Sequence, residues 1–594
     1  KMLVLLRQGR ISKWVSGIGQ EAISVGAAMA LDHEAYMLPM HRNLGMFTSR
    51  GVPFDRLFSQ WQGKLNGFSK GRERSFHFGT QDYRLVGMIS HLGPQLAIAD
   101  GIALAHKLKK EKQVCFVITG DGGTSEGDFH EALNVASVWD LPVIFCIESN
   151  GYGLSTPSNE QYRCAQLADR ALGYGMESRV IDGNNLLEVY HTISELAASL
   201  KERPRPVLLE CITFRMRGHE EASGTKYVPQ ELFEEWKKKD PVDNYRNWLL
   251  QEKLADDIAL EAIHQDIKQE INAGVKKVFD EPEVKANTQN ELSEVFAPFQ
   301  FRPAPPKSGR SKELRFVDAV KEGLEEALKA HPDLVFMGQD IATYGGVFKA
   351  TEGFLEKFGE ARIRNTPLCE SAIFGTALGL SIQGMKSMVE MQFADFVTSG
   401  FNQVVNNLAK IHYRWGQNAD VVVRMPTGAG VGAGPFHSQS NESWFCHTPG
   451  LKVFYPAFPE DAKGLLLTAF EDVNPVLFFE HKALYRSVSS EVPEGYYTIE
   501  PGKAISRSNG DQLAIITYGM GVHWALEAAQ EFPENSLEII DLRTLIPLDE
   551  ASILEAVKKC NRALVLYEDT LTGGFGAEIA ALISEKAFAW LDAP

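Results

Sequence analysis

The sequence predicts an α/β protein in which parallel sheets are arranged in two or three successive domains. Apolar stretches of strand length alternate with amphipathic helical stretches in both halves of the chain. The length of 594 residues is enough for several domains, and 44 % hydrophobic and 23 % charged residues are typical of a globular protein. Residues 281–312, which end in PAPPKSGRSK, show neither the apolar period of a helix nor that of a strand and are predicted to be a linker.

The first half contains a strand–helix–strand unit. Residues 112–119 form an apolar run, residues 126–140 place Phe129, Leu133, Ala136 and Trp139 on one helical face, and residues 141–149 form a second apolar run. This order predicts a right-handed βαβ unit in a parallel sheet. A further strand is expected at 207–212, and a long charged helical stretch at about 230–279.

The second half repeats this alternation twice. Near residue 314 a second α/β region begins, and near residue 511 a third. The expected strands are 334–337, 361–366, 386–392, 420–424, 512–519 and 536–542. The expected helices are 316–330, 371–382, 401–414 and 521–531.

Composition excludes several classes of protein. A net charge of −17 disfavours a nucleic-acid partner, because neutralising phosphates requires concentrated Lys and Arg. No apolar run approaches the roughly 20 residues of a membrane span. The seven cysteines are scattered without C-x-x-C or ligand spacing, which favours buried thiols in a reducing compartment. The chain begins with Lys1 inside a helical pattern, so we expect it to be part of a longer product.

A glycine-rich turn follows the first apolar strand. Gly120-Asp121-Gly122-Gly123 joins this strand to a helix, and its backbone N–H groups are suited to cradling a diphosphate. Asn150 follows the next strand, and the carboxyl ends of neighbouring parallel strands lie side by side. A carboxylate, an amide oxygen and a main-chain carbonyl suit Mg²⁺ or Ca²⁺. Each motif alone is also a common turn sequence.

The pair of motifs resembles the thiamine diphosphate signature, and residues 120–157 resemble the α subunit of 2-oxoacid dehydrogenase E1 components. The resemblance implies that Asp121, Asn150 and the Tyr152 carbonyl hold the cation. It assigns the cofactor pocket to Arg42, His41, Leu92, Gly120, Gly122 and Gly123, and a catalytic role to His219 in RMRGHEEASG. His41 replaces the family's usual tyrosine. Glu220 stands where regulated members carry a phosphorylatable serine, so kinase control at that position is not expected.

A second set of motifs supplies a carboxylic acid. Glu370 opens the apolar helix at 371–382, where a glutamate alone would only complement the helix dipole. The segments NTPLCE, QFADF, HSQS, FFEHKALYR and LTGGF, however, resemble the E1 β subunit, branched-chain members in particular. The resemblance implies that Glu370 is the acid beside the cofactor's aminopyrimidine, that Phe396 packs on this ring, and that His437 is an active-site histidine. Gln339 stands where the family usually has glutamate.

One glycine-rich segment suggests a different cofactor. PTGAGVGAG follows the strand at 421–425, as in a dinucleotide site. No acidic residue ends a strand about 20 residues later, which argues against NAD binding there.

The chain thus resembles E1 α and β subunits fused in one chain. The resemblance implies a thiamine diphosphate-binding fold, with two parallel-sheet cofactor domains plus a transketolase C-terminal-like α/β domain. Residues 1–280 would be the E1 α-like diphosphate-binding domain, 281–312 the linker, 313–495 the E1 β-like pyrimidine-binding domain, and 496–594 the last domain, which we expect to be truncated. The implied cofactors are thiamine diphosphate and Mg²⁺, with Ca²⁺ or Mn²⁺ as alternatives and K⁺ as a candidate structural ion.

The implied function is oxidative decarboxylation of a 2-oxo acid, with reductive acylation of a lipoyl group. A branched-chain substrate such as 3-methyl-2-oxobutanoate is favoured. The expected partners are the lipoyl and subunit-binding domains of an E2 acyltransferase, without nucleic acid or membrane. Because separate subunits form α2β2 tetramers, the fused chain predicts a homodimer. Whether Asp121 and Glu370 of one cofactor site come from the same chain stays open.

Three alternatives remain open. A pyruvate or acetoin dehydrogenase E1 would share the whole machinery, a transketolase-like transferase would share the cofactor only, and a degenerate scaffold would have lost catalysis. The cytoplasm is expected for a bacterial-type fused chain, with the mitochondrial matrix as the alternative.

Overall fold

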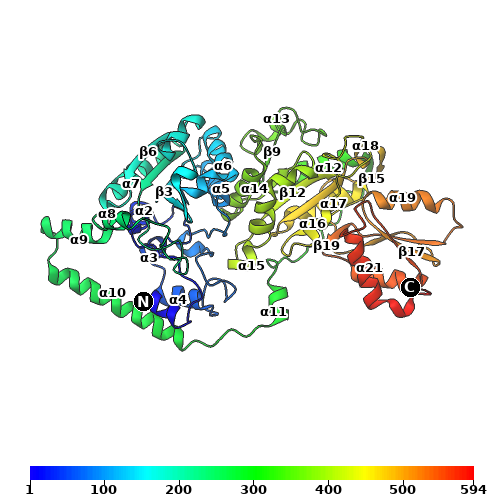
Figure 1. The fold of residues 1–594 in the computed structure, drawn as a ribbon. Coiled ribbons are helices and arrows are strands. Elements are labelled where there is room, and N and C mark those ends of the chain that lie inside the picture. The colour runs from blue at the N-terminus through cyan, green and yellow to red at the C-terminus, as the bar shows by residue number, and fades with distance from the viewer. Residues whose placement is uncertain (594) are drawn as a thin grey trace. The chain divides into compact units, whose positions relative to one another are not determined.

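A computed structural model describes residues 1–593 of the protein (Figure 1). The chain divides into two compact units. Unit 1 comprises Lys1–Ser293 with Tyr413–Gln417, and unit 2 comprises Glu294–His412 with the residues from Asn418 onward. Both units are α/β with mainly parallel sheets, which confirms the predicted fold class. Within the described chain, no helix combines the length and apolarity that crossing a membrane requires.

Unit 1 contains a five-stranded parallel sheet in the order β1-β2-β3-β7-β6. Its strands are β1 (Met37–Leu38), β2 (Cys115–Gly120), β3 (Val143–Ser149), β6 (Glu177–Asp182) and β7 (Val207–Ile212). A short hairpin of β4 (Tyr152–Gly153) and β5 (Thr156–Pro157) follows β3. The predicted βαβ unit is confirmed, because β2 and β3 pair in parallel and α6 (Gly127–Val138) connects them.

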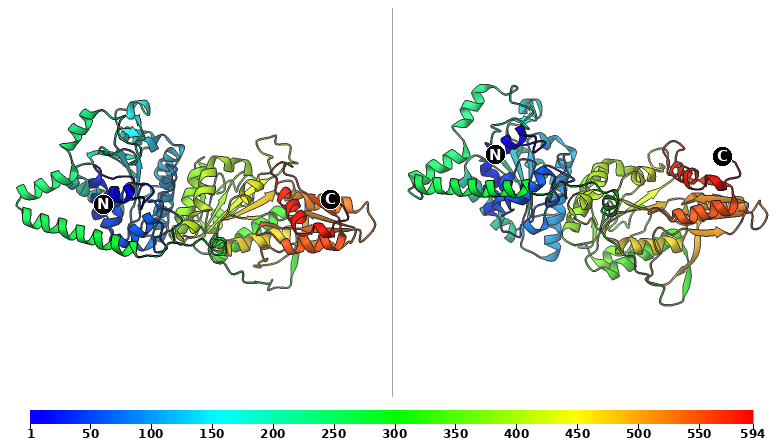
Figure 2. Two further views of the ribbon diagram at one scale, coloured as in Figure 1. Left: turned by 60° about the horizontal axis from the view of Figure 1, so that its bottom comes forward. Right: turned by 90° about the horizontal axis from the view of Figure 1, so that it is seen from below.

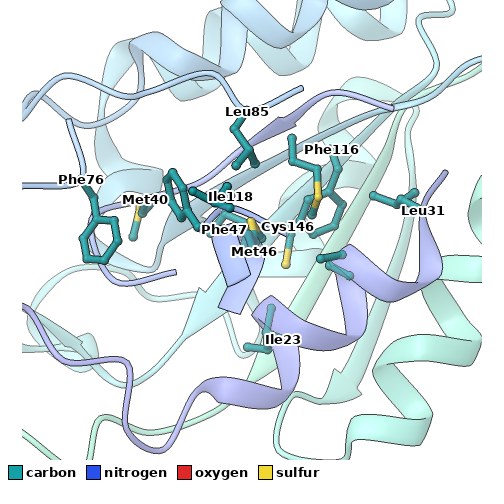
Figure 3. Close-up of a cluster of buried hydrophobic side chains, with 14 of the residues drawn as sticks. Ile23, Leu31, Met40, Met46, Phe47, Phe76, Leu85, Phe116, Ile118 and Cys146 are labelled. Atoms are coloured by element: carbon teal, nitrogen blue, oxygen red, sulfur yellow. The ribbon is translucent and has the colours of Figure 1, made fainter. Parts of the chain in front are cut away.

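The helices of unit 1 are α1 (Met2–Arg7), α2 (Glu21–Ala30), α3 (Leu44–Ser49), α4 (Phe54–Gln62), α5 (Pro94–Lys109), α6, α7 (Leu186–Glu202), α8 (Gln230–Lys237), α9 (Pro241–Gln251), α10 (Asp257–Phe279) and α11 (Thr288–Ser293). Helices such as α2, α5, α6 and α7 pack around this sheet, while α8 to α11 follow its last strand. Figure 3 shows part of the buried core, in which Phe116 and Ile118 of β2 lie among side chains such as Phe47 of α3 and Ile23 of α2. Burial of these apolar side chains fixes the sheet against its helices.

The charged stretch at 230–279 is not one helix, as the sequence suggested, but three. Asp240 caps α9, which has Pro241 at its first position, and Asp256 caps α10 through the Ala259 N–H. Both caps begin a new helix where the chain turns. Figure 2 shows α10 as a long green helix, of which only the C-terminal end, at Gly274, Val275 and Val278, is buried.

Unit 2 contains a seven-stranded sheet in the order β10-β9-β11-β12-β14-β13-β19, parallel except for β19. Its strands are β9 (Val335–Gly338), β10 (Ile363–Asn365), β11 (Ser387–Glu390), β12 (Val421–Thr427), β13 (Lys452–Phe454), β14 (Val476–His481) and β19 (Thr544–Ile546). A second sheet, in the order β16-β18-β17-β20, consists of β16 (Ile505–Ser508), β17 (Leu513–Thr517), β18 (Leu537–Asp541) and β20 (Ala563–Leu566). The antiparallel pair of β8 (Ser311–Arg315) and β15 (Ser489–Pro493) forms a separate two-stranded sheet.

The helices of unit 2 are α12 (Phe316–Ala330), α13 (Phe354–Phe358), α14 (Glu370–Ile382), α16 (Glu442–Cys446), α17 (Pro459–Glu471), α18 (Leu484–Ser487), α19 (Met520–Ala529), α20 (Glu550–Cys560) and α21 (Phe575–Lys586). Three of the four helices predicted in unit 2 are confirmed, as α12, α14 and α19, while the other helices were not predicted. The predicted linker is not devoid of regular structure, because it contains α11 and the first residues of β8.

The continuous helix predicted at 401–414 is wrong. The chain forms a π-helical turn at Gln403–Leu408 and then the short helix α15 (Ile411–Trp415). The wider turn buries Gln403 and Asn407 together, and the Asn407 amide donates to Gln403 Oε1 at 2.7 Å. A period of 3.6 residues cannot reveal this inserted residue.

Candidate functional site

The cation-site candidates meet at one edge of the unit 1 sheet. Asp121 directly follows β2, and Asn150 directly follows β3, its parallel neighbour. Asp121 is buried, and its Oδ1 accepts a hydrogen bond from the Gly122 N–H at 2.8 Å. Within the described residues its Oδ2 has no hydrogen-bond partner. A buried carboxylate oxygen left unpaired is suited to binding a cation.

The surroundings of Asp121 support this interpretation. Burial raises the pKa of the Asp121 carboxyl, and the N–H groups of Gly151 and Tyr152 offset part of the shift without bonding to Oδ2. Asn150 is also buried, and its Oδ1 accepts only a long hydrogen bond from the Tyr152 N–H, at 3.3 Å. The donor set thus offers a carboxylate oxygen and an amide oxygen, with the Tyr152 carbonyl two residues further on, which fits a hard divalent cation.

The glycines of the turn allow the backbone to pack closely. A Cβ on Gly122 would lie 3.0 Å from Gly153 Cα, and one on Gly123 would lie 2.3 Å from Thr119 Oγ1. Gly120 has more space, with Met40 Cε at 3.5 Å as the nearest neighbour. Glycine at 122 and 123 therefore lets the turn pack closely against Gly153 and Thr119.

A cavity of about 370 Å³ opens beside this turn. Of the predicted residues, His41, Leu92, Gly122 and His219 line it. Its walls also include the aromatic side chains of Trp14, Trp61 and Phe76, which contact one another with ring centroids 5.2 to 5.8 Å apart. The cavity therefore combines an apolar wall with imidazole groups.

Arg42 is buried behind the cavity wall. It donates to the Ser16 carbonyl at 2.8 Å and to the His219 carbonyl at 3.2 Å, so it links two loops of the site. Burial lowers the pKa of Arg42 to about 10, which leaves the guanidinium charged at neutral pH. A buried cation without a carboxylate hydrogen-bond partner favours an anionic ligand.

His219 is held as a neutral imidazole. Burial, with the charges of Arg42 and Arg215, lowers its pKa to about 4. Arg215 Nη1 lies 3.2 Å from His219 Nδ1, and because a guanidinium only donates, Nδ1 accepts and Nε2 carries the proton. The His41 ring is edge-on to that of His219, with centroids 5.3 Å apart, and burial places the pKa of His41 well below its usual range.

The remaining predicted residues lie together in unit 2. Glu370 is half-buried at the first position of α14, and its Oε1 accepts from Gln339 Nε2 at 3.3 Å. Phe396 and His437 contact each other, with ring centroids 5.5 Å apart. Glu370 lies close to the helical turn that carries Phe396. A Cβ on Gly400 of this turn would lie 3.0 Å from the Glu370 carbonyl oxygen.

Sequence reasoning missed three polar residues of these sites. Glu148 is fully buried, accepts from Asn43 Nδ2 at 2.6 Å and Gln20 Nε2 at 3.0 Å, and has a pKa raised by burial to about 7. Arg215 orients His219, and Lys482 lies beside Phe393. A charged residue within or directly after an apolar strand was the available signal for Glu148 and Lys482.

Comparison with known proteins covers nearly the whole chain. Family models match residues 1–287 (Dehydrogenase E1 component), 312–488 (Transketolase, pyrimidine binding domain) and 502–594 (Transketolase, C-terminal domain). The last two are domains of the thiamine diphosphate-binding fold, which confirms the predicted fold.

Individual relatives match the second half of the chain. The 2-oxoisovalerate dehydrogenase subunit beta of Bacillus subtilis is 44 % identical over 285 residues, 47 % of this chain and 87 % of the relative. The mitochondrial 2-oxoisovalerate dehydrogenase subunit beta of Dictyostelium discoideum is 42 % identical over 293 residues, 48 % of this chain and 79 % of the relative. The pyruvate dehydrogenase E1 component subunit beta of Bacillus subtilis is 42 % identical over 286 residues, 48 % of this chain and 88 % of the relative. With an E1 model on its first half and E1 β relatives on its second, the chain belongs to the thiamine diphosphate-dependent 2-oxoacid dehydrogenase E1 family, with α- and β-type parts in one chain.

Proposed function

We propose that the protein is the E1 component of a branched-chain 2-oxoacid dehydrogenase complex. It would decarboxylate 3-methyl-2-oxobutanoate and related acids and transfer the acyl group to the lipoyl group of an E2 acyltransferase. The observation that carries the proposal is the buried Oδ2 of Asp121 at the glycine turn, which has no hydrogen-bond partner among the described residues and lies beside a cavity lined by three imidazoles. The bacterial relatives favour the cytoplasm, and the mitochondrial relatives keep the mitochondrial matrix as the alternative. The domain limits 280, 312 and 495 remain part of the proposal.

Residues of unit 1 would hold the charged end of the cofactor. Asp121, Asn150 and the Tyr152 carbonyl would bind Mg²⁺, and the turn from Gly120 to Gly123 with Arg42 would bind the diphosphate. Leu92 and His41 would complete the pocket wall. When bound, thiamine diphosphate accepts the electron pair that remains as CO₂ leaves.

Residues of unit 2 would serve the aminopyrimidine end. Glu370 would bond to the aminopyrimidine through Oε2, because its Oε1 already accepts from Gln339. Phe396 would pack on the ring, and His437 would act as proton donor or orienting group in the acyl transfer. His219 would share that task with its Nε2–H, which the contact with Arg215 leaves available.

The wall of the cavity favours a branched aliphatic substrate. Trp14, Trp61 and Phe76 present apolar surface to a cavity that also contains His41 and His219. An apolar wall stabilises each additional methyl group of a substrate by about 1 kcal/mol. The relatives include both 2-oxoisovalerate and pyruvate dehydrogenase subunits, so pyruvate is the second candidate.

The purified protein with thiamine diphosphate and Mg²⁺ tests the proposal. We expect CO₂ release from 3-methyl-2-oxobutanoate at higher kcat/KM than from pyruvate or 2-oxoglutarate, with reduction of added lipoamide. A preference for pyruvate would assign the second candidate. Transfer of two-carbon units between sugar phosphates, without CO₂ release, would contradict the proposal and favour a transketolase-like transferase.

A further inference from the structure

The loop that carries His437 has little rigidity of its own. It leaves β12 at Gly428, and glycines 428, 430, 432 and 434 have positive φ values of 84°, 87°, 69° and 76°. Phe436, directly before His437, is 73 % exposed. Because glycine-rich backbone is conformationally permissive, contacts from outside the loop must fix the position of His437.

The base of the loop is held by residues that follow β14 and β20. Lys482, which is buried, donates from Nζ to the Gly428 carbonyl at 2.7 Å. Glu568 accepts from the Ala429 N–H at 3.0 Å and also bonds to His481 Nε2 at 2.6 Å. A Cβ on Gly428 would lie 2.1 Å from the same His481 nitrogen, so the loop base fits tightly against this strand end.

The far end of the loop is held separately. Asp395 Oδ1 accepts from both the N–H and the side-chain amide of Gln439, at 3.2 and 3.0 Å. Between these two ends, the His437 N–H donates to the Gly434 carbonyl at 3.3 Å, and side-chain packing adds to this backbone bond in positioning the stretch.

Lys482 reaches that stretch through an aromatic ring. Its Nζ lies 5.7 Å from the centroid of Phe393. The Phe393 ring is edge-on to His437 at 4.8 Å and 86°, and it also contacts Phe396 at 5.5 Å. One ammonium group therefore touches both the loop base and the ring against which His437 rests.

Two nearby carboxylates stabilise the charged form of the Lys482 side chain. Burial lowers its pKa to about 8, and the carboxylates of Asp395 and Glu568 oppose that shift. A cation near an aromatic face is stabilised when it is desolvated, which compensates part of the cost of burial.

We propose that Lys482 is a positioning residue that holds His437 in place, through its hydrogen bond to the Gly428 carbonyl and its contact with the Phe393 ring. The inference rests on the proposed function only in the role of His437, since the contacts themselves do not depend on it.

The test replaces Lys482 with Met, which keeps the length of the side chain and removes its charge. A matched control exists in Lys463, a buried lysine that donates to the Pro493 carbonyl at 2.8 Å and lies 5.2 Å from the Tyr497 ring. Lys463→Met removes the same two kinds of contact at α17 and, in addition, an ion pair with Glu322 at 2.7 Å, so it reports at least the general cost of losing a buried lysine. Phe393→Leu removes the ring but leaves the bond to Gly428, and it replaces Lys482→Met should that variant not fold.

Two measurements are made on the full-length protein. In hydrogen exchange, we expect Lys482→Met to accelerate exchange of residues 429–437, and Lys463→Met to leave them unchanged. In turnover, we expect Lys482→Met and Phe393→Leu to lower kcat for lipoyl acylation about tenfold or more, with KM for the 2-oxo acid nearly constant. Unchanged exchange and kcat in Lys482→Met, or the same changes in Lys463→Met, would overturn the proposal.

The wild-type protein separates this inference from the proposed function. Absence of any 2-oxo acid turnover by the wild type would contradict the proposed function, while hydrogen exchange would still decide whether Lys482 holds the loop. Turnover by the wild type that His437→Ala abolishes and Lys482→Met preserves would contradict the positioning role alone.

Discussion

At the scale of single residues, the proposed function makes Asp121 the group on which cofactor binding depends most. Among the described residues its Oδ2 has no hydrogen-bond partner, whereas its Oδ1 already bonds to Gly122. We predict that Asp121→Asn keeps that bond and loses cation binding. At saturating thiamine diphosphate and Mg²⁺ the wild type should gain about 3 kcal/mol in stability, seen as a higher Tm, and Asp121→Asn should gain almost none.

A surface variant provides the control for this prediction. Asp32 of the same unit forms an exposed ion pair with Lys201. Asp32→Asn should show the full increase in Tm on addition of the cofactor and Mg²⁺. An equal increase in Asp121→Asn would show that this carboxylate does not hold the cation.

Glu442 leads to a prediction about pH. It is buried, accepts from the Tyr518 hydroxyl at 2.9 Å, and its pKa is raised to about 7, first by burial and then by Asp569. A raised pKa means that the folded protein keeps a proton that the unfolded chain loses near pH 4.5. Wild-type stability therefore decreases as pH rises from 4.5 to 7, by about 3 kcal/mol for this group.

The variant Glu442→Gln cannot lose that proton. Relative to the wild type, we predict that its Tm rises steadily between pH 5 and 7.5, as followed by thermal unfolding. A difference in Tm that stays constant over this range would mean that Glu442 is ionised in the folded protein throughout.

At the scale of elements, two mid-helix glycines have opposite surroundings. Gly26 of α2 faces α7, and an added Cβ would lie 2.7 Å from Val189 Cγ1. Gly323 of α12 faces α17, where an added Cβ would meet Leu466 at 3.4 Å and Lys463 at 3.5 Å, which is ordinary contact. The same substitution should therefore have opposite signs at the two positions.

We predict that Gly26→Ala destabilises unit 1 by about 1 to 3 kcal/mol, because overpacking separates the helices. Gly323→Ala should stabilise unit 2 by up to about 1 kcal/mol, because alanine favours a helix over glycine. Thermal unfolding of both variants measures the signs. A loss of stability in Gly323→Ala, or none in Gly26→Ala, would contradict the packing described at these crossings.

At the scale of the whole molecule, helices and strands could be predicted from the sequence wherever neighbouring residues determine them. The βαβ unit around Asp121, the helix opened by Glu370 and strand β7 follow directly from apolar periodicity. Side chains that meet across the fold could not be predicted in this way. Arg215 touches His219 and Lys482 touches Phe393 because of loop paths, and the π-helical turn at Gln403–Leu408 inserts a residue that no fixed period contains.

The last prediction concerns assembly. The proposed function implies a homodimer, with a mass of about twice 65.9 kDa by light scattering, and a monomer in solution would contradict it. Within such a dimer, Asp121→Ala disables the residues for the diphosphate end of the cofactor, and Glu370→Ala disables those for its aminopyrimidine end. Each variant alone should therefore be inactive. If each site combines Asp121 of one chain with Glu370 of the other, every mixed dimer keeps one intact site of its two. Co-refolding the two variants should then restore about a quarter of wild-type activity. We predict this recovery only for mixed dimers, and the same mixture of Asp121→Ala with Asn150→Ala, whose lesions fall in one set, should stay inactive.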